Sequence, residues 1–160
     1  MVASDHELAS QAGLEVLRAG GNAIDAAAAV SFALAVTRPY STGLGGGGFM
    51  VVYFADGRVL AQDFRETAPS DLKGDFYVKL KVANPSAPNP SEFGATAVAT
   101  PGVVAGRCQA LAQWGTMPRD RVFGAALRLA AEGFAVEEDH VRHVREALEY
   151  YAAHPTLKES

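Results

Sequence analysis

Residues 23–35 form an alanine-rich, mostly apolar run that limits how this chain can fold. Asn22 precedes the run as a predicted helix N-cap, and Asp25 stands three residues later, where the acid of a capping box is found. The run is rich in alanine and apolar on most sides of a helix, which is typical of a helix buried between layers. The pair Arg38-Pro39 is expected to end it.

A first helix is expected before this run, with Ser4 or Asp5 as its N-cap and the pair Gly20-Gly21 at its end. The elements expected after the run are a hairpin of strands 49–54 and 58–64 around Asp56-Gly57, a long loop over 67–93, a short strand over 95–99, and helices over 103–113, 122–131 and 137–153. This order predicts an α+β or layered α/β fold, in a single domain that spans residues 1–160.

Composition and charge exclude several classes of function. Hydrophobic residues make up 49% of the chain and charged residues 20%, as in globular proteins, and no apolar run approaches the length of a membrane span. The net charge of −4 argues against binding nucleic acid. Cys108 is the one cysteine, so an intramolecular disulfide is impossible, and a buried, inert thiol is expected there. Residues 1–6 lack the features of a signal peptide.

The glycine-rich residues 43–48 match the spacing of a dinucleotide-binding loop, but their context is different. Such a loop follows a strand and opens a helix, whereas this segment follows a helix and opens a strand. No Lys-Ser or Lys-Thr pair follows, as a phosphate-binding P-loop requires. We therefore expect a structural role, with backbone in positive-φ or closely packed geometry, and no cofactor.

Three histidines are candidates for chemistry. His140 and His143 lie one turn apart on a predicted helix, a spacing that can bind a metal, but their charged neighbours favour a solvated helix face, so no metal site is predicted. His6 lies in a first helical turn and is expected at the surface.

Arg65 is the residue of greatest chemical interest. It lies at the end of the second predicted strand, where a guanidinium can present a planar pair of donors to a carboxylate. The residues alone leave two interpretations open: Arg65 binds a substrate carboxylate, or it forms an ion pair with Glu66, Asp63 or another acid.

Several segments, in chain order, are similar to signatures of one known family: Ala-Ser at 3–4 and 9–10, GGNAIDAA at 20–27, TGLGGGGF at 42–49, DFRETAP at 63–69, AVATPG at 97–102 and AAEGFAV at 130–136. Through them the chain resembles the γ-glutamyltransferase (glutathione hydrolase) family over nearly its whole length. The resemblance implies an αββα four-layer sandwich of the N-terminal-nucleophile hydrolases, incomplete in this chain. It also implies a precursor that cuts itself into a large and a small subunit, and in bacteria a periplasmic or extracellular location.

In this family a threonine at the start of the small subunit is the nucleophile, with its own α-amino group as base. The enzymes take the γ-glutamyl group from glutathione or a related amide and pass it to water, an amino acid or a peptide. The resemblance implies that Arg65 binds the α-carboxylate of the γ-glutamyl donor. It assigns no catalytic residue to this chain, because none of its threonines has the context of the processing site; these are Thr37, Thr42, Thr67, Thr96, Thr100, Thr116 and Thr156.

The chain is therefore expected to be part of a large subunit, inactive alone, whose partner is the small subunit of the same precursor. Two alternatives stay open. A cephalosporin or glutaryl acylase of the same fold would act on a different acyl group, and glutaryl substrates also carry a carboxylate. A split or degenerate fragment would serve only as a binding or scaffold chain.

Overall fold

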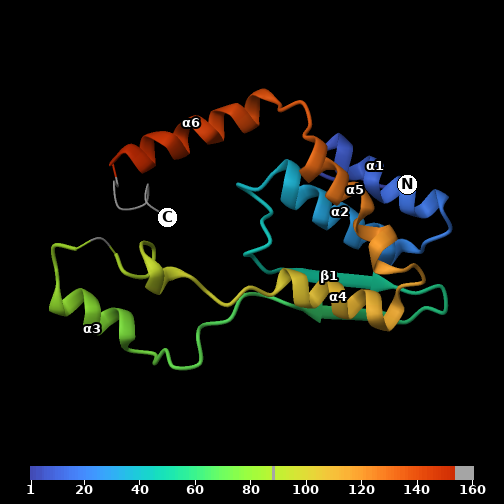
Figure 1. The fold of residues 1–160 in the computed structure, drawn as a ribbon. Helices are drawn as coiled ribbons and strands as arrows, with labels where there is room; N and C mark the ends of the chain where they lie inside the picture. Colours follow the sequence, from blue (N-terminus) through green and yellow to red (C-terminus); the bar gives the residue numbers. More distant parts are fainter. Residues whose placement is uncertain (88, 154–160) are drawn as a thin grey trace. The chain divides into compact units, whose positions relative to one another are not determined.

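The computed structural model describes residues 1–87 and 89–153, and these form two compact units. The helical unit contains Met1–Gly43 and the described residues from Ala110 onward, and the hairpin unit contains Leu44–Gln109 (Figure 1). Helix α4 (Val103–Trp114) begins in the hairpin unit and ends in the helical unit. Across the described residues, no helix combines the length and the apolar character that crossing a membrane requires.

The helical unit is built around α2 (Ala23–Thr37), which packs against both α1 (Glu7–Arg18) and α5 (Arg119–Glu132) (Figure 1). The predicted burial of α2 is confirmed, since Ala29 and Ala33 are completely inaccessible to solvent. The core of this unit is formed mainly by short side chains, including Val16, Ala26, Ala28, Leu111 and Val122. Short side chains allow neighbouring helices to approach closely while the interior stays filled.

The N-cap of α1 lies one residue after Asp5 and two after Ser4, the predicted caps. The N-cap is His6, whose Nδ1 accepts a hydrogen bond of 3.1 Å from the backbone N–H of Leu8. The expectation that Ser4 or Asp5 caps the helix is therefore wrong, and so is the expectation of an exposed His6, which is 7% exposed. His6 is buried because its ring turns back over the helix start and packs in a T-shaped arrangement with Phe134.

The start of α2 has the predicted capping box, extended by a second segment of chain. The Asn22 side chain accepts from the N–H groups of Ile24 and Asp25, and the Asp25 carboxylate accepts from the N–H of Asn22 at 2.9 Å. Asp25, which is inaccessible to solvent, also accepts from the Thr116 hydroxyl at 2.8 Å and from the N–H groups of Thr116 and Met117. Burial favours a higher pKa for the Asp25 carboxyl, but these donated hydrogen bonds outweigh it and lower that pKa.

The predicted hairpin is confirmed in the second unit. Strands β1 (Phe49–Tyr53) and β2 (Val59–Asp63) pair antiparallel, with Phe49 opposite Asp63 and Tyr53 opposite Val59. Gly57 has a φ of +88°, a value that glycine adopts readily and other residues rarely do. The Asp56 carboxylate accepts hydrogen bonds from the backbone and side chain of Arg58 and closes the turn.

The two faces of the hairpin differ in exposure. Met50, Val52, Leu60 and Gln62 are half-buried, and the Gln62 side chain donates to the carbonyl of Gly106 in α4. The opposite face exposes a band of apolar side chains, namely Phe49, Val51, Tyr53 and Val59. Within the described residues this sheet has two strands, so both of its outer edges lack a strand partner.

Two expectations for the residues after the hairpin are wrong. The segment 67–93, expected to be a loop, contains α3 (Phe76–Ala83), because its eight residues include neither glycine nor proline and Lys79 pairs with Asp75 one turn before it. The segment 95–99, expected to be a strand, contains a 3₁₀ helix (Ala95–Ala97). Gly94 precedes it with a φ of +85° and accepts from the N–H of Ala97, which turns the chain out of extended geometry.

The three helices predicted after residue 100 are confirmed, with slightly different ends. They are α4, α5 and α6 (Glu138–Ala153).

Asp25→Asn should destabilise the chain by about 2–4 kcal/mol, because an amide NH₂ would face backbone donors that now bind a carboxylate. Since the folded pKa of Asp25 lies below its ordinary value, the stabilisation is complete above about pH 4 and is lost as pH falls through the folded pKa. Urea unfolding at several pH values measures both effects. Asp56→Asn, at the exposed hairpin turn, is the control; equal losses in the two variants would contradict the prediction.

The isolated chain should self-associate through the exposed hairpin face and sheet edges. Val51→Lys combined with Tyr53→Lys should reduce that association, because charged side chains oppose edge-to-edge pairing. Sedimentation velocity measures the change. A wild-type chain that is monomeric and unfolds cooperatively would contradict this expectation.

Candidate functional site

Arg65 lies two residues after the end of β2, with its side chain 67% exposed. Its Nε lies 3.4 Å from Oε2 of Glu66, and its backbone N–H donates to Oδ1 of Asp63 at 2.9 Å. Glu66 is thus the acid beside the Arg65 guanidinium, whereas Asp63 accepts a hydrogen bond from the Arg65 backbone. Substrate binding by Arg65 stays a prediction.

The backbone at Arg65 lies between two hydrogen-bonded pairs. On one side, Gly48 and Phe64 exchange hydrogen bonds of 3.3 and 3.0 Å, which extend the hairpin by one residue pair. On the other side, Thr67 and Thr100 exchange bonds of 3.2 and 2.9 Å. Arg65 and its neighbour are therefore constrained at both ends, as a binding group on a rigid element should be.

Phe64 holds the same segment in place through its buried side chain. Its side chain is 8% exposed, and the guanidinium carbon of Arg107 lies 4.7 Å from the centre of its ring. Burial lowers the pKa of Arg107, yet a guanidinium stays charged in proteins, so this is a cation–π contact. Since successive residues of an extended chain point to opposite sides, a buried Phe64 directs Arg65 outward.

The predicted histidine pair lies in the helical unit and is not a solvated face. His140 Nδ1 lies 3.2 Å from the carbonyl oxygen of Thr37, and the ring of His143 stacks on Tyr40 at 4.1 Å. Both histidines are half-buried because the end of α2 and the residues after it cover this face of α6. Among residues 1–87 and 89–153, no group of three or more His, Cys, Asp and Glu side chains is arranged to hold a metal.

Arg38 holds the start of α6 against the end of α2. Its Nη2 donates to Oδ2 of Asp139 at 2.8 Å, and its Nη1 donates to the carbonyl of Asp5 at 2.8 Å. The Nε lies 2.9 Å from Asp5 Oδ2, although its N–H is not directed well enough for a hydrogen bond. The Arg38 side chain is only 14% exposed, and it joins the residues before α1 to the start of α6.

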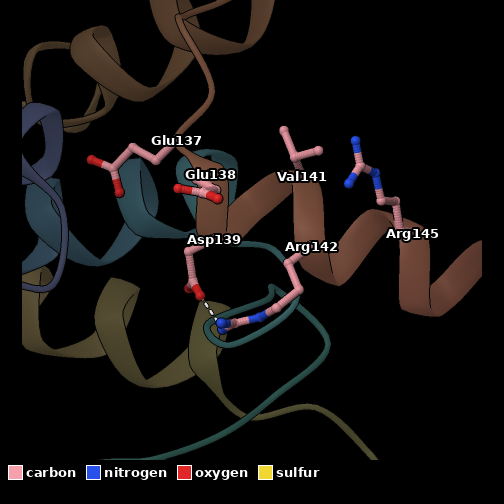
Figure 2. Close-up of a pocket in the computed structure, with 6 residues that line it drawn as sticks. All are labelled: Glu137, Glu138, Asp139, Val141, Arg142 and Arg145. Carbon is pink, nitrogen blue, oxygen red and sulfur yellow. Dashed lines mark hydrogen bonds and ion pairs between the residues drawn. The ribbon is translucent and has the colours of Figure 1, made fainter.

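A pocket of about 680 Å³ lies beside the start of α6 (Figure 2). Its lining comes from one short stretch of chain, namely Glu137, Glu138, Asp139, Val141, Arg142 and Arg145. Arg142 bonds to Asp139, and Figure 2 shows Arg145 pointing away from that pair. The mixture of opposite charges on one helix is typical of a solvated surface, and it contains no residue that sequence analysis assigned to the substrate.

In the part of the chain that the structure describes, four threonine hydroxyls are engaged in hydrogen bonds. The hydroxyls of Thr37, Thr42 and Thr96 donate to backbone carbonyls, and that of Thr116 donates to Asp25. Thr156 lies outside the described residues. Cys108, expected to be buried, is half-buried on α4.

The γ-glutamyltranspeptidase family model matches residues 9–160. The chain belongs to the γ-glutamyltranspeptidase family. It is 45% identical over 138 residues to a glutathione hydrolase proenzyme of Escherichia coli, which covers 86% of this chain and 23% of that protein. It is 44% identical over 140 residues to the acylase ACY 1 proenzyme of Pseudomonas sp. strain V22, covering 85% of this chain and 25% of that protein.

Solved structures of the family have the same arrangement. The γ-glutamyltranspeptidase of Helicobacter pylori superposes with a TM-score of 0.89 and 39% identity, covering 99% of this chain and 45% of that one. The mixture of helices and strands described here is thus the γ-glutamyltranspeptidase fold of the N-terminal-nucleophile hydrolases, over the part that this chain spans. The chain spans about a quarter of the length of the curated relatives it matches.

The sequence predicts a role for Arg65 but gives little indication of the residues that surround it. Phe64, Gly102 and Gly106 were predicted only as parts of a strand, a turn and a helix. Their shared contact joins segments about 40 residues apart, which no local pattern reveals. Gly106 lies inside a predicted helix although glycine is a poor helix former, and this was the one feature of the sequence that pointed to a close contact there.

Arg38→Met should loosen α6 from the rest of the helical unit, because the half-buried Asp139 would lose its ion pair with Arg38 and keep only the one with Arg142, which lies within α6. We expect a loss of about 2 kcal/mol. Faster hydrogen exchange over residues 138–150 measures the effect. Arg142→Met, whose ion pairs lie within α6, is the matched control; similar exchange in both variants would contradict the assignment.

Proposed function

We propose that the protein containing this chain cleaves γ-glutamyl amides such as glutathione and transfers the γ-glutamyl group to water, an amino acid or a peptide. Family membership and the named glutathione hydrolase relatives support this assignment. The observation that carries it is Arg65, an exposed cation on a segment of backbone constrained at both ends.

In this proposal Arg65 binds the α-carboxylate of the donor. The contact with Glu66 involves Nε, so a carboxylate can approach Nη1 and Nη2 end-on while that contact is kept. A guanidinium suits this role because it is always charged and presents paired donors in a plane. Glu66 is also placed to attract the α-ammonium group of the same donor, which a plain glutaryl group lacks.

The nucleophile is proposed to lie elsewhere, as a threonine at the start of a small subunit cut from the same precursor. The relatives are named as proenzymes, which supports a processed precursor. The threonine hydroxyls described above donate to carbonyls or to Asp25, which supports an inactive chain when the small subunit is missing.

We also propose that the hairpin is part of the incomplete αββα sandwich. The apolar band of Phe49, Val51, Tyr53 and Val59 would face a second sheet, and the open edges of β1 and β2 would pair with further strands. Burying this band would stabilise the assembly by removing large apolar side chains from water.

An acylase is the second candidate function. The Pseudomonas acylase is nearly as similar to this chain as the Escherichia coli hydrolase, and a cephalosporin acylase of Bacillus halodurans superposes with a TM-score of 0.83. A glutaryl group would also offer a carboxylate to Arg65. The pair of Arg65 and Glu66 favours the γ-glutamyl donor, which carries both charges. An inert binding or scaffold chain is the remaining alternative, and it would show no activity with its partner subunit.

Arg65→Ala in the full-length precursor should reduce kcat/KM for γ-glutamyl-p-nitroanilide by roughly 100-fold, equivalent to about 3 kcal/mol for a lost charged hydrogen-bond pair. Release of p-nitroaniline is measured for the chain alone, for the precursor and for the variant. Arg58→Ala, an exposed arginine at the turn of the same hairpin, is the matched control and should change little.

Activity in the chain alone would contradict the assignment of the nucleophile to the small subunit. Silence of a correctly processed precursor towards γ-glutamyl-p-nitroanilide, with activity towards a glutaryl amide, would favour the acylase.

A further inference from the structure

Three glycines from two distant parts of the hairpin unit contact residues 64–66 directly, two of them at the backbone and one at the Phe64 side chain. A Cβ at Gly47 would lie 2.5 Å from the Glu66 nitrogen and 2.8 Å from the Arg65 carbonyl carbon. A Cβ at Gly102 would lie 2.8 Å from the carbonyl carbon of Phe64 and closer still to its oxygen. Real Cβ atoms do not approach other heavy atoms so closely, so any side chain there would displace the backbone.

The third glycine contacts the Phe64 side chain from within α4. A Cβ at Gly106 would lie 2.8 Å from Cδ1 of Phe64 and closer to its Cγ and Cβ. Gly106 is buried near the start of α4, where alanine would favour the helix more. The close contact with Phe64 is the physical reason for a glycine at this position.

Hydrogen bonds link the same segments. The carbonyl of Gly46 accepts from the N–H groups of Gly102 and Val103, both at 3.0 Å. The segment before β1 is thereby tied to the start of α4, with the Phe64–Glu66 backbone in contact with both. Arg65 thus projects from a place where three stretches of backbone touch without side chains between them.

We infer that Gly47, Gly102 and Gly106, the contact glycines, are positioning residues for Arg65 and set its affinity for the donor carboxylate. This inference rests on the proposed function of Arg65. A Cβ at any of the three would push the 64–66 backbone outward or turn it. The guanidinium would then miss the carboxylate, although the hairpin and α4 could still form.

The chain offers a matched control in the same glycine run. A Cβ at Gly45 meets nothing within 4 Å, and its φ is not in the left-handed region, so Gly45→Ala should be accommodated. Gly47→Ala, two residues later, should not. The two variants make the same chemical change and differ only in contact with the Arg65 segment.

The test measures KM and kcat for γ-glutamyl-p-nitroanilide in the full-length precursor carrying Gly45→Ala, Gly47→Ala, Gly106→Ala or Arg65→Ala. Gly47→Ala and Gly106→Ala should raise KM about tenfold or more, as is expected of Arg65→Ala, because a small misplacement of a binding group is costly. Gly45→Ala should leave KM within about twofold of wild type, the size of a surface change. A merely structural defect would lower the amount of active enzyme and hence the apparent kcat, with KM unchanged.

The possible failures are distinguishable. If Arg65→Ala leaves KM unchanged, the proposed role of Arg65 is wrong. If Arg65→Ala raises KM but Gly47→Ala does not, the role of the contact glycines is wrong and that of Arg65 stands. Should neither glycine variant yield processed enzyme, Phe64→Leu decides, because it removes the ring contact without adding a clash; an unchanged KM there overturns the inference.

Discussion

Close approach of backbone segments, allowed by alanine and glycine, is the constraint on which both units depend. In the helical unit, Ala29 and Ala33 let α2 lie against its neighbours with no solvent access. In the hairpin unit, Gly47 and Gly106 let the chain around Phe64 touch two other segments. Interiors are packed as densely as organic crystals, so one added methyl group in such a contact must displace something.

The polar interactions stabilise what the small residues permit. Asp25 is buried with donors from the start of α2 and from the loop after α4, so its charge is compensated by hydrogen bonds rather than by a cation. Arg38 acts similarly between α2 and α6, with carboxylates and a carbonyl around one guanidinium. Leaving a buried charge with only some of its hydrogen-bond partners costs free energy. Each network therefore favours the one arrangement of its segments in which all the partners are present.

The proposed role of Arg65 depends on the same rigidity. An exposed arginine on a mobile loop would lose conformational entropy on binding a carboxylate, whereas Arg65 sits on backbone already constrained by Gly48, Thr100 and the contact glycines. The apolar band on the hairpin shows the opposite situation. Phe49, Val51 and Tyr53 are exposed here, and the proposed sandwich is the arrangement that would remove them from water.

The amino-acid sequence by itself determined the elements whose signals are local. The Asn22 cap with Asp25, the Asp56-Gly57 turn and the helical periodicities after residue 100 all depend on neighbours within a few residues, and the structure confirms them. Ordered signatures indicated the family and, through it, nominated Arg65. Local reasoning was wrong where chain geometry changes within a few residues, as at α3 and at the turn after Gly94.

Only the tertiary structure decided which distant residues meet. His6 is buried because its ring lies against Phe134, and His143 is half-buried because Tyr40 covers it. Gly106 and Phe64 are separated in sequence by α3 and a 3₁₀ helix, yet they are in contact. Such contacts depend on packing between helices and strands rather than on the conformational propensity of residues within one element. No periodic pattern in a single sequence reveals them.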